Sequence, residues 1–159
     1  MSLDINTPKG QESLAQEQEM LDLLHKAFPL ATFAQTPKDL PADVDGFAIM
    51  GANKVAAVFE SKCRDMSRAQ LSKFGDEWLV TFEKIQKGAQ IAKSLCVPLV
   101  GYLYLVPDKK VLMVRIADEN GNFLPKIRIE RTETQATTNG GQIVRTNAYI
   151  DVSGAKVVA

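Results

Sequence analysis

The apolar residues near the start of the chain repeat with the period of a helix. Over residues 11–28 they lie on one face of a helical projection, and Pro29 follows directly and ends the pattern. The ten residues before this segment are polar and contain Pro8 and Gly10. We therefore predict a helix over residues 11–28, preceded by a flexible tail over residues 1–10. The apolar face consists of Leu14, Leu21, Leu24 and Phe28.

Two short apolar runs, over residues 46–50 and 55–59, predict a pair of strands over residues 46–50 and 55–62. The connection Gly-Ala-Asn-Lys between them is typical of a tight hairpin. The second run begins with five uninterrupted apolar residues, which favours a strand that is covered on both faces. Residues 34–43 contain two prolines and predict a loop. No strand is therefore evident between the first helix and the hairpin.

The next part of the chain predicts helices followed by strands. Residues 67–73 favour a short helix, and apolar residues share one stripe over residues 76–95, which predicts a longer one. Two strands follow, over residues 99–106 and 111–116, with a Pro-Asp-Lys-Lys turn between them. The helix would cross over the sheet between the strands on either side of it.

The C-terminal residues predict further strands with weaker patterns. Residues 123–130 and 143–152 favour strands, and the small polar residues at 132–141 predict a mobile loop. We expect an α/β fold in a single domain over residues 11–159. Its core would span about residues 11–116, with a β-rich C-terminal extension over residues 117–159.

Composition narrows the classes of function. Basic and acidic residues number 19 each, so the chain does not coat nucleic acid by bulk charge, although a local basic groove remains compatible with this balance. Cys63 and Cys96 have no CxxC spacing and indicate reduced thiols. Two cysteines and a single histidine cannot supply the four ligands of a structural zinc site. The N-terminus lacks the apolar core of a signal peptide, and no apolar run is long enough to cross a bilayer. We expect a cytoplasmic protein.

Three residues of the predicted hairpin point to chemistry. Asp45 precedes the first strand, and Glu60 and Lys62 end the second. Side chains alternate along a strand, so Glu60 and Lys62 should share a face, and the neighbouring strand can bring Asp45 beside them. Two clustered carboxylates repel each other, and a divalent cation removes this conflict. Mg²⁺ prefers oxygen ligands and would polarise a phosphodiester and acidify a bound water.

This D…ExK pattern resembles the PD-(D/E)XK, or restriction-endonuclease-like, nuclease superfamily. The resemblance covers roughly residues 11–116 and implies a central mixed β-sheet flanked by helices in αβββαβ order. It implies that Asp45, Glu60 and the main-chain carbonyl of Ser61 hold Mg²⁺ or Mn²⁺, and that Lys62 assists the attacking water. The motif is short, so an ordinary solvated Glu–Lys pair at a strand end is the alternative.

The resemblance also suggests an acidic residue from the first helix. Glu17 falls within the apolar stripe on a helical projection, whereas Glu19 falls on the opposite side. Glu17 is therefore our fourth candidate catalytic residue. The alternative is that Glu17 lies at the rim of the apolar face and is solvated.

The function that these residues favour is metal-dependent hydrolysis of DNA phosphodiester bonds. A catalytically inactive nucleic-acid-binding or assembly module that kept the nuclease fold is the main alternative. A third is an unrelated α/β protein with a chance motif, for which the carboxylates of Asp45 and Glu60 would lie far apart. We expect the partner to be a nucleic acid, with DNA as the first candidate, and we expect no membrane partner. A homodimer is compatible with the sequence.

Overall fold

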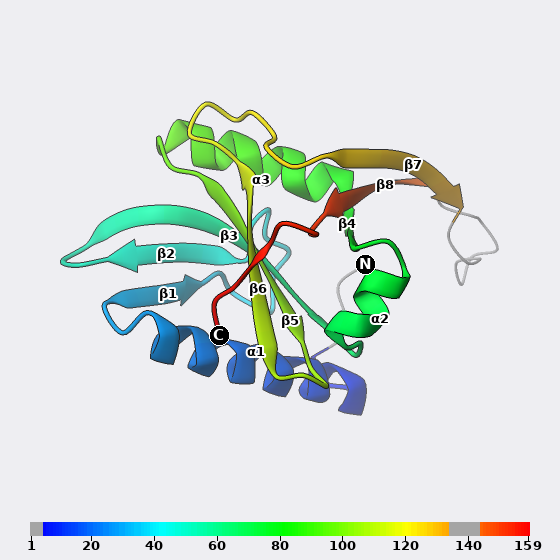
Figure 1. The fold of residues 1–159 in the computed structure, drawn as a ribbon. Helices are drawn as coiled ribbons and strands as arrows, with labels where there is room; N and C mark the ends of the chain where they lie inside the picture. Colours follow the sequence, from blue (N-terminus) through cyan, green and yellow to red (C-terminus); the bar gives the residue numbers. More distant parts are fainter. Residues whose placement is uncertain (1–4, 134–143) are drawn as a thin grey trace.

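A mixed six-stranded sheet forms the centre of the fold in the computed structural model, which describes residues 5–133 and 144–159 (Figure 1). The strand order is β1-β2-β3-β5-β6-β9, and a smaller sheet has the order β4-β8-β7. The elements are α1 (Pro8–Ala27), β1 (Ala31–Gln35), β2 (Gly46–Met50), β3 (Lys54–Arg64), α2 (Arg68–Lys73), β4 (Glu77–Thr81), α3 (Phe82–Ser94), β5 (Leu99–Leu105), β6 (Lys110–Ala117), β7 (Ile127–Glu133), β8 (Val144–Asp151) and β9 (Lys156–Val157).

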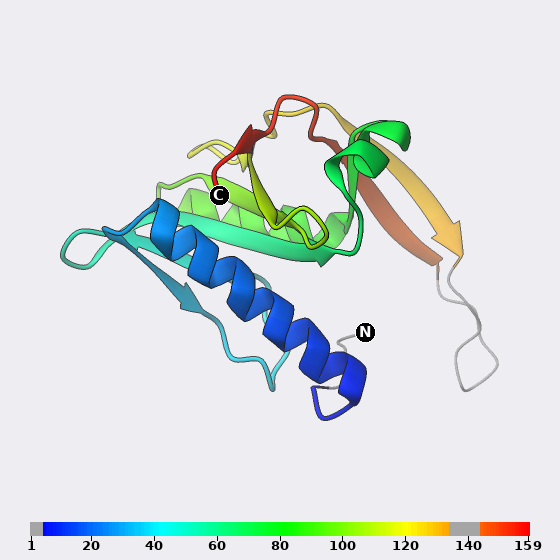
Figure 2. The same ribbon diagram turned by 60° about the horizontal axis from the view of Figure 1, so that its bottom comes forward.

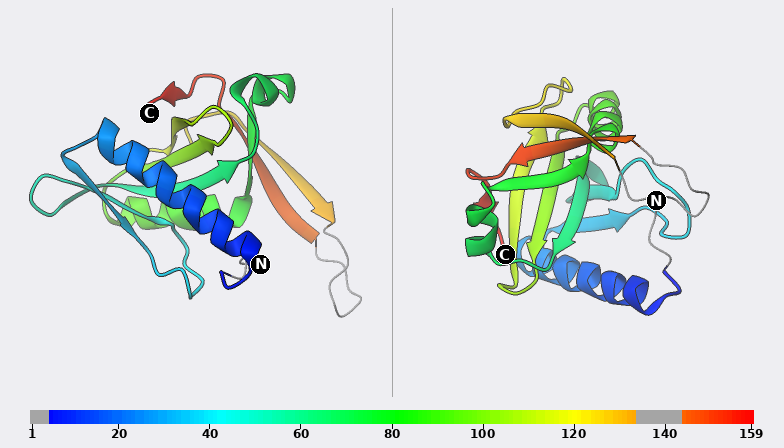
Figure 3. Two further views of the ribbon diagram at one scale, coloured as in Figure 1. Left: turned by 90° about the horizontal axis from the view of Figure 1, so that it is seen from below. Right: turned by 90° about the vertical axis from the view of Figure 1, so that its right-hand side faces the viewer.

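The two long helices cover opposite faces of the central sheet (Figures 1 and 2). α1 contacts β1, β3 and β6 on one face, and α3 contacts β3, β5 and β6 on the other. The small sheet lies on the same side as α3 (Figure 3). The chain is thus an α/β fold with a mixed central sheet flanked by helices, as the sequence predicts.

Strand β3 lies at the middle of the sheet and links its two halves. It pairs antiparallel with β2 and parallel with β5, and the chain between β3 and β5 crosses over through α2, β4 and α3. Its side chains alternate between the two cores. Val58 packs in the core beneath α3, and Phe59 packs in the core beneath α1. This alternation sets the face on which each later residue of β3 lies.

The predicted helix over residues 76–95 is wrong in its first part. Residues Glu77–Thr81 form β4, which pairs with β8, and the helix begins at Phe82. The apolar stripe that includes Trp78 and Phe82 fits both a helix and a strand entering a helix. Trp78, Val80 and Thr81 have high strand propensity, and pairing with β8 decides the outcome.

A strand that is not evident from the sequence precedes the hairpin, as the αβββαβ order requires. Residues Ala31–Gln35 form β1, which pairs antiparallel with the whole of β2. Helix α1 begins earlier than predicted, at Pro8, because the hydroxyl of Thr7 caps it by accepting from the N–H of Gly10 at 3.0 Å. The predicted tail therefore ends before Pro8, and its residues 1–4 lie outside the described residues.

The C-terminal strands differ from the prediction mainly in their bounds. β7 begins at Ile127, and the predicted start at Phe123 is only an isolated bridge to Ala117. β7 continues to Glu133, which shortens the predicted loop over residues 132–141; the rest of that loop lies outside the described residues. Within residues 5–133 and 144–159, no helix is long and apolar enough to cross a membrane.

Candidate functional site

Asp45 lies at the point where β2 begins and its pairing with β3 ends. The N–H of Asp45 donates to the carbonyl of Phe59 at 3.2 Å. The next residue, Gly46, lies opposite Phe59 in the last paired position of β2 and β3. A side chain at Gly46 would come within 2.3 Å of the carbonyl of Ala34 and would also collide with the Phe59 ring. The Asp-Gly pair therefore allows the close approach of β1, β2 and β3 that sets Asp45 beside Glu60.

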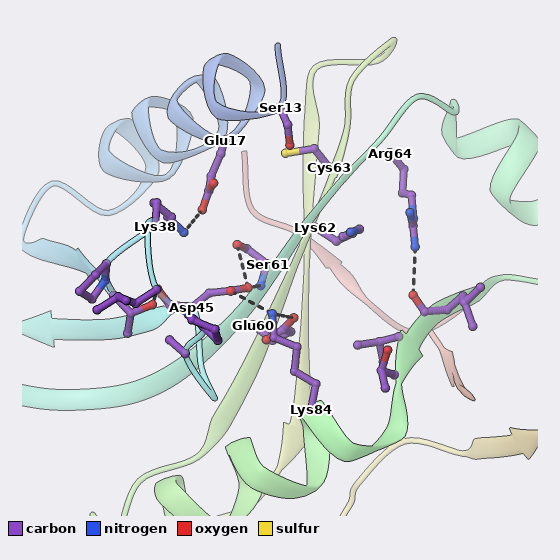
Figure 4. Close-up of a pocket in the computed structure, with 18 of the residues that line it drawn as sticks. Ser13, Glu17, Lys38, Asp45, Glu60, Ser61, Lys62, Cys63, Arg64 and Lys84 are labelled. Carbon is purple, nitrogen blue, oxygen red and sulfur yellow. Dashed lines mark hydrogen bonds and ion pairs between the residues drawn. The ribbon is translucent and has the colours of Figure 1, made fainter. Parts of the chain in front are cut away.

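Beyond this point, β3 continues to Arg64 and has no β2 residue opposite it. The edge of β3 that faces Asp45 is therefore available to the site. The N–H of Ser61 donates to Oδ2 of Asp45 at 2.8 Å (Figure 4). The N–H and C=O of one residue point to the same side of an extended strand, so the Ser61 carbonyl faces this same open edge.

Glu60 is almost completely enclosed. It is 5% exposed, and it is the one buried side chain with an ionisable carboxyl or basic group within the part of the chain that the structure describes. It extends β3 on the α3 side of the sheet, two residues after Val58. The predicted convergence is found: Asp45 and Glu60 are brought together, and they are not the distant pair that a chance motif would give.

A third residue, Lys84 in the first turn of α3, connects the two carboxylates. Its Nζ lies 3.2 Å from Oδ1 of Asp45 and 3.1 Å from Oε1 of Glu60 (Figure 4). The Lys84 side chain is 36% exposed, so the ammonium reaches the carboxylates from the solvent side. One cation thus bridges two acids that come from different elements of the fold.

The ionisation of this cluster is strongly perturbed. Burial first, and the neighbouring charge of Asp45 second, raise the pKa of Glu60 to about 8. For Lys84, burial alone would lower the pKa, but the attraction of Glu60 and Asp45 outweighs it and the pKa is raised. Burial and the charge of Asp45 thus favour the protonated form of Glu60, and the two acids favour the charged form of Lys84.

Lys62 lies on the same strand face as Glu60 and lines the same hollow. Burial lowers its pKa, and the positive charges of Arg64 and Lys84 add to this effect. A lysine with a lowered pKa exchanges a proton more readily near neutral pH than an exposed lysine does. Arg64 lies two residues after Lys62 on β3, and its Nη2 donates to the carbonyl of Leu79 in β4 at 3.1 Å.

Glu17 faces the hollow from α1, with a side chain that is 19% exposed (Figure 4). Its Oε1 accepts from Nζ of Lys38 at 2.6 Å and from Nε2 of Gln35 at 3.0 Å. The interactions of Glu17 thus tie the loop after β1 to the helix. Glu17 borders the site through Lys38 and Gln35, and its part in catalysis stays a prediction.

The structure corrects the placement of Glu19. The helical projection turned Glu19 away from the sheet, but its Oε1 accepts from the hydroxyl of Tyr104 in β5 at 2.6 Å and from Nζ of Lys109. Glu17 lies within the buried stripe of α1, between Leu24 and Leu21, as the projection predicts. Glu19 lies on the other side of Met20 and reaches β5 with its long side chain.

A hollow of about 630 Å³ opens over these residues. Its walls come from α1, the loop between β1 and β2, the free end of β3, β4, the start of α3 and the start of β8 (Figure 4). Three of its side chains are acidic and five are basic. The acids are Glu17, Asp45 and Glu60, and the basic residues are Lys38, Lys62, Arg64, Lys84 and Arg145.

The residues at this position could bind a divalent cation, but the protein would supply only a few of its ligands. Among the described residues, no group of three or more His, Cys, Asp or Glu side chains is arranged to hold a metal. Asp45, Glu60 and the Ser61 carbonyl offer oxygen atoms at one edge, which matches the one or two carboxylates that Mg²⁺ takes from proteins. The ammonium of Lys84 already bridges the acids, so this position accepts positive charge.

Two basic residues of the site were not predicted as parts of it. Lys84 lies 39 positions from Asp45 and inside the helix predicted over residues 76–95, so no local pattern connects it with the acids. Arg145 reaches the hollow through the pairing of β8 with β4, which no local pattern indicates. Lys84 lies three residues after the end of β4, and the position of β4 brings the start of α3 to the site. Lys84 could be assigned to the site from the sequence only if β4 were recognised first.

Comparisons with known proteins give no relative for this chain. The sequence matches no family model, and no curated protein and no solved structure is significantly similar to it.

Proposed function

We propose that this chain is a divalent-metal-dependent nuclease that hydrolyses DNA phosphodiester bonds at Asp45, Glu60 and Lys62. The observation that carries the proposal is the convergence of the Asp45 and Glu60 carboxylates on one cation, with Lys62 in the same hollow. Burying an acid beside another acid is costly, and Glu60 shows the cost in its raised pKa. A bound metal ion would turn this costly arrangement into a site.

The order of elements adds support. A helix, three antiparallel strands, a crossover helix and a parallel strand follow one another as α1, β1, β2, β3, α3 and β5, with α2 and β4 inserted before α3. Apart from the insertion, this order agrees with the αβββαβ order that the resemblance to restriction-endonuclease-like proteins implies. Asp45 lies immediately before β2 and Glu60 lies within β3, where the D…ExK motif of that family would lie.

The proposed mechanism assigns a separate role to the metal ligands and to Lys62. A bound Mg²⁺ or Mn²⁺ would polarise the phosphodiester and acidify a water molecule. Asp45, Glu60 and the Ser61 carbonyl would hold the ion, and Glu60 must first lose its proton. Lys62, with its lowered pKa, would orient the attacking water or offset the charge that develops on the phosphate.

The basic residues of the hollow suit the DNA backbone. Lys38, Arg64 and Arg145 stand around the acids on three different elements and would contact phosphates rather than bases. A net charge near zero is compatible with this, since five basic side chains line the hollow.

A second candidate is favoured by Lys84. Because this ammonium already bridges both acids, it offsets part of their negative charge without a metal ion. A nucleic-acid-binding or assembly module that retained the nuclease fold would need no more than this. The two candidates differ in whether the protein cleaves DNA.

The deciding experiment incubates the purified protein with labelled single-stranded, duplex and branched DNA in Mg²⁺, Mn²⁺ or EDTA. The proposal predicts cleavage with either metal, none in EDTA, and loss of cleavage in Asp45→Asn and Glu60→Gln. Asp43→Asn is the matched control, since Asp43 is exposed, lies two residues from Asp45 and pairs with Lys87. DNA binding without cleavage in every metal would select the second candidate.

A further inference from the structure

Lys84 makes a contact that a catalytic lysine does not need. Its Nζ lies within hydrogen-bonding distance of both acids, at 3.2 Å from Asp45 and 3.1 Å from Glu60. The other oxygen of Asp45 is engaged by the N–H of Ser61. The ammonium therefore occupies the space that the two carboxylates enclose, which is the space that a metal ion bound to both would take.

A lysine ammonium and a divalent cation exclude each other at such a position. Both need the same carboxylate oxygens, and two positive charges a few ångströms apart repel strongly at a partly buried site. The Lys84 side chain is long, rises from the first turn of α3 and is 36% exposed. It can swing toward solvent, where a flexible four-carbon side chain keeps its charge hydrated.

We propose that Lys84 is a built-in counter-cation that holds Asp45 and Glu60 together in the metal-free protein and is displaced when a divalent cation binds. The affinity of the site for metal is then set by competition with Lys84. The inference rests on the proposed function in one respect, that Asp45 and Glu60 are metal ligands.

The chain supplies a matched control in Lys87, which lies nearly one turn further along the same helix. Lys87 also bridges two acids, with Nζ 3.5 Å from Asp43 and 3.1 Å from Glu83. Those acids are 56% and 71% exposed, whereas the Glu60 side chain is 7% exposed. Removing Lys87 therefore changes helix charge by the same amount without touching a buried carboxylate.

The test measures Mn²⁺ binding to the metal-free protein by calorimetry, with no DNA present. Lys84→Met keeps the length of the side chain and removes its charge, and it should tighten Mn²⁺ binding about tenfold or more. Lys84→Arg should stay within about threefold of wild type, because it retains a competing cation. Lys87→Met should bind as wild type does.

Thermal melting gives a second readout. In EDTA, Lys84→Met should melt at a lower temperature than wild type, because it leaves two carboxylates without a counter-cation, and saturating Mn²⁺ should recover the difference. Lys84→Gln repeats the test with a side chain that can still hydrogen-bond, in case the methionine variant does not fold in EDTA. Folding of either variant only when Mn²⁺ is added would also support the inference.

The outcomes separate this inference from the proposed function. If Lys84→Met and Lys84→Gln bind Mn²⁺ no more tightly than wild type, or if neither variant binds it, Lys84 is not a competitor and the inference fails. If wild type binds no metal but Lys84→Met does, the inference holds and the proposed function fails for the natural chain. Equal metal affinity in both proteins, with metal-dependent cleavage by wild type, would leave the function standing and remove the inference.

Discussion

Gly101 lies directly opposite Glu60 in the paired register of β5 and β3, and the indole of Trp78 fills the space above it. A side chain at Gly101 would come within 2.4 Å of the Trp78 ring. The absence of a side chain thus leaves room for the indole at the position paired with Glu60. Glu60 itself is buried, and burial is the first cause of its raised pKa.

The raised pKa of Glu60 predicts how stability depends on pH in the absence of metal. An acid whose pKa is higher in the folded than in the unfolded protein stabilises the fold below its unfolded value, and this contribution is lost as pH rises through the folded value. Glu60 moves from 4.5 to about 8. In EDTA, the free energy of unfolding should therefore fall between about pH 5 and pH 8.

Glu60→Gln should flatten this part of the profile, because glutamine is neutral throughout. The measurement is urea denaturation at a series of pH values for wild type and Glu60→Gln. Lys84 does not titrate in this window, since its pKa is raised from an already high value. Parallel profiles for the two proteins would show that Glu60 is ionised normally and would contradict the account of its environment.

The acids should also determine whether metal stabilises the protein. If Asp45 and Glu60 hold the ion, millimolar Mg²⁺ or Mn²⁺ should raise the melting temperature of wild type by mass action. Asp45→Asn and Glu60→Gln should each abolish the rise, and Asp43→Asn should keep it. The size of the rise should grow with pH toward 8, because Glu60 must lose its proton to bind. A melting curve indifferent to metal in wild type argues against the site.

Glu17 should affect cleavage through the side of the hollow that it forms. Glu17→Gln weakens the pair with Lys38, and we expect metal-dependent cleavage to fall by a few-fold to about tenfold. Glu12→Gln, at an exposed position of the same helix, should cleave as wild type does. Glu19 is unsuitable as the control because it binds Tyr104 and Lys109.

Lys38→Met shows how Glu17 acts. If Glu17 acts by holding Lys38, both variants should lose activity to the same degree, with the loss mainly in KM for DNA. If the Glu17 carboxylate serves the reaction itself, only Glu17→Gln should lower kcat. Wild-type kinetics in Glu17→Gln would reduce Glu17 to a solvated rim residue.

The sequence was sufficient for the parts of the site that are close along the chain. Asp45, Glu60 and Lys62 belong to one hairpin, and strand alternation alone places Glu60 and Lys62 on one face. The strands β2, β3, β5 and β6 likewise have strong apolar patterns, and each was predicted near its observed bounds. In these segments, local pattern and tertiary structure agree.

The parts that failed depend on distant pairing. β1 is a five-residue edge strand whose sequence, Ala-Thr-Phe-Ala-Gln, has little apolar signal, and it exists because β2 offers it a partner. β4 was absorbed into a helix because its partner β8 lies some seventy positions later in the sequence. Without β4, the start of α3 is misplaced, and Lys84 could not be assigned to the site.

The most direct test of the central claim concerns Lys62. It is measured as the single-turnover rate of DNA cleavage by wild type, Lys62→Ala and Lys54→Ala, with metal and DNA binding measured on the same samples. Lys54 begins β3 and is exposed at the far end of the strand, so Lys54→Ala is the matched control.

We predict that Lys62→Ala folds and binds metal and DNA but cleaves about a hundredfold more slowly, because one contact to the developing charge is worth on the order of 3 kcal/mol. Lys54→Ala should cleave at the wild-type rate. Equal metal-dependent cleavage by wild type and Lys62→Ala would place the activity elsewhere and contradict the mechanism.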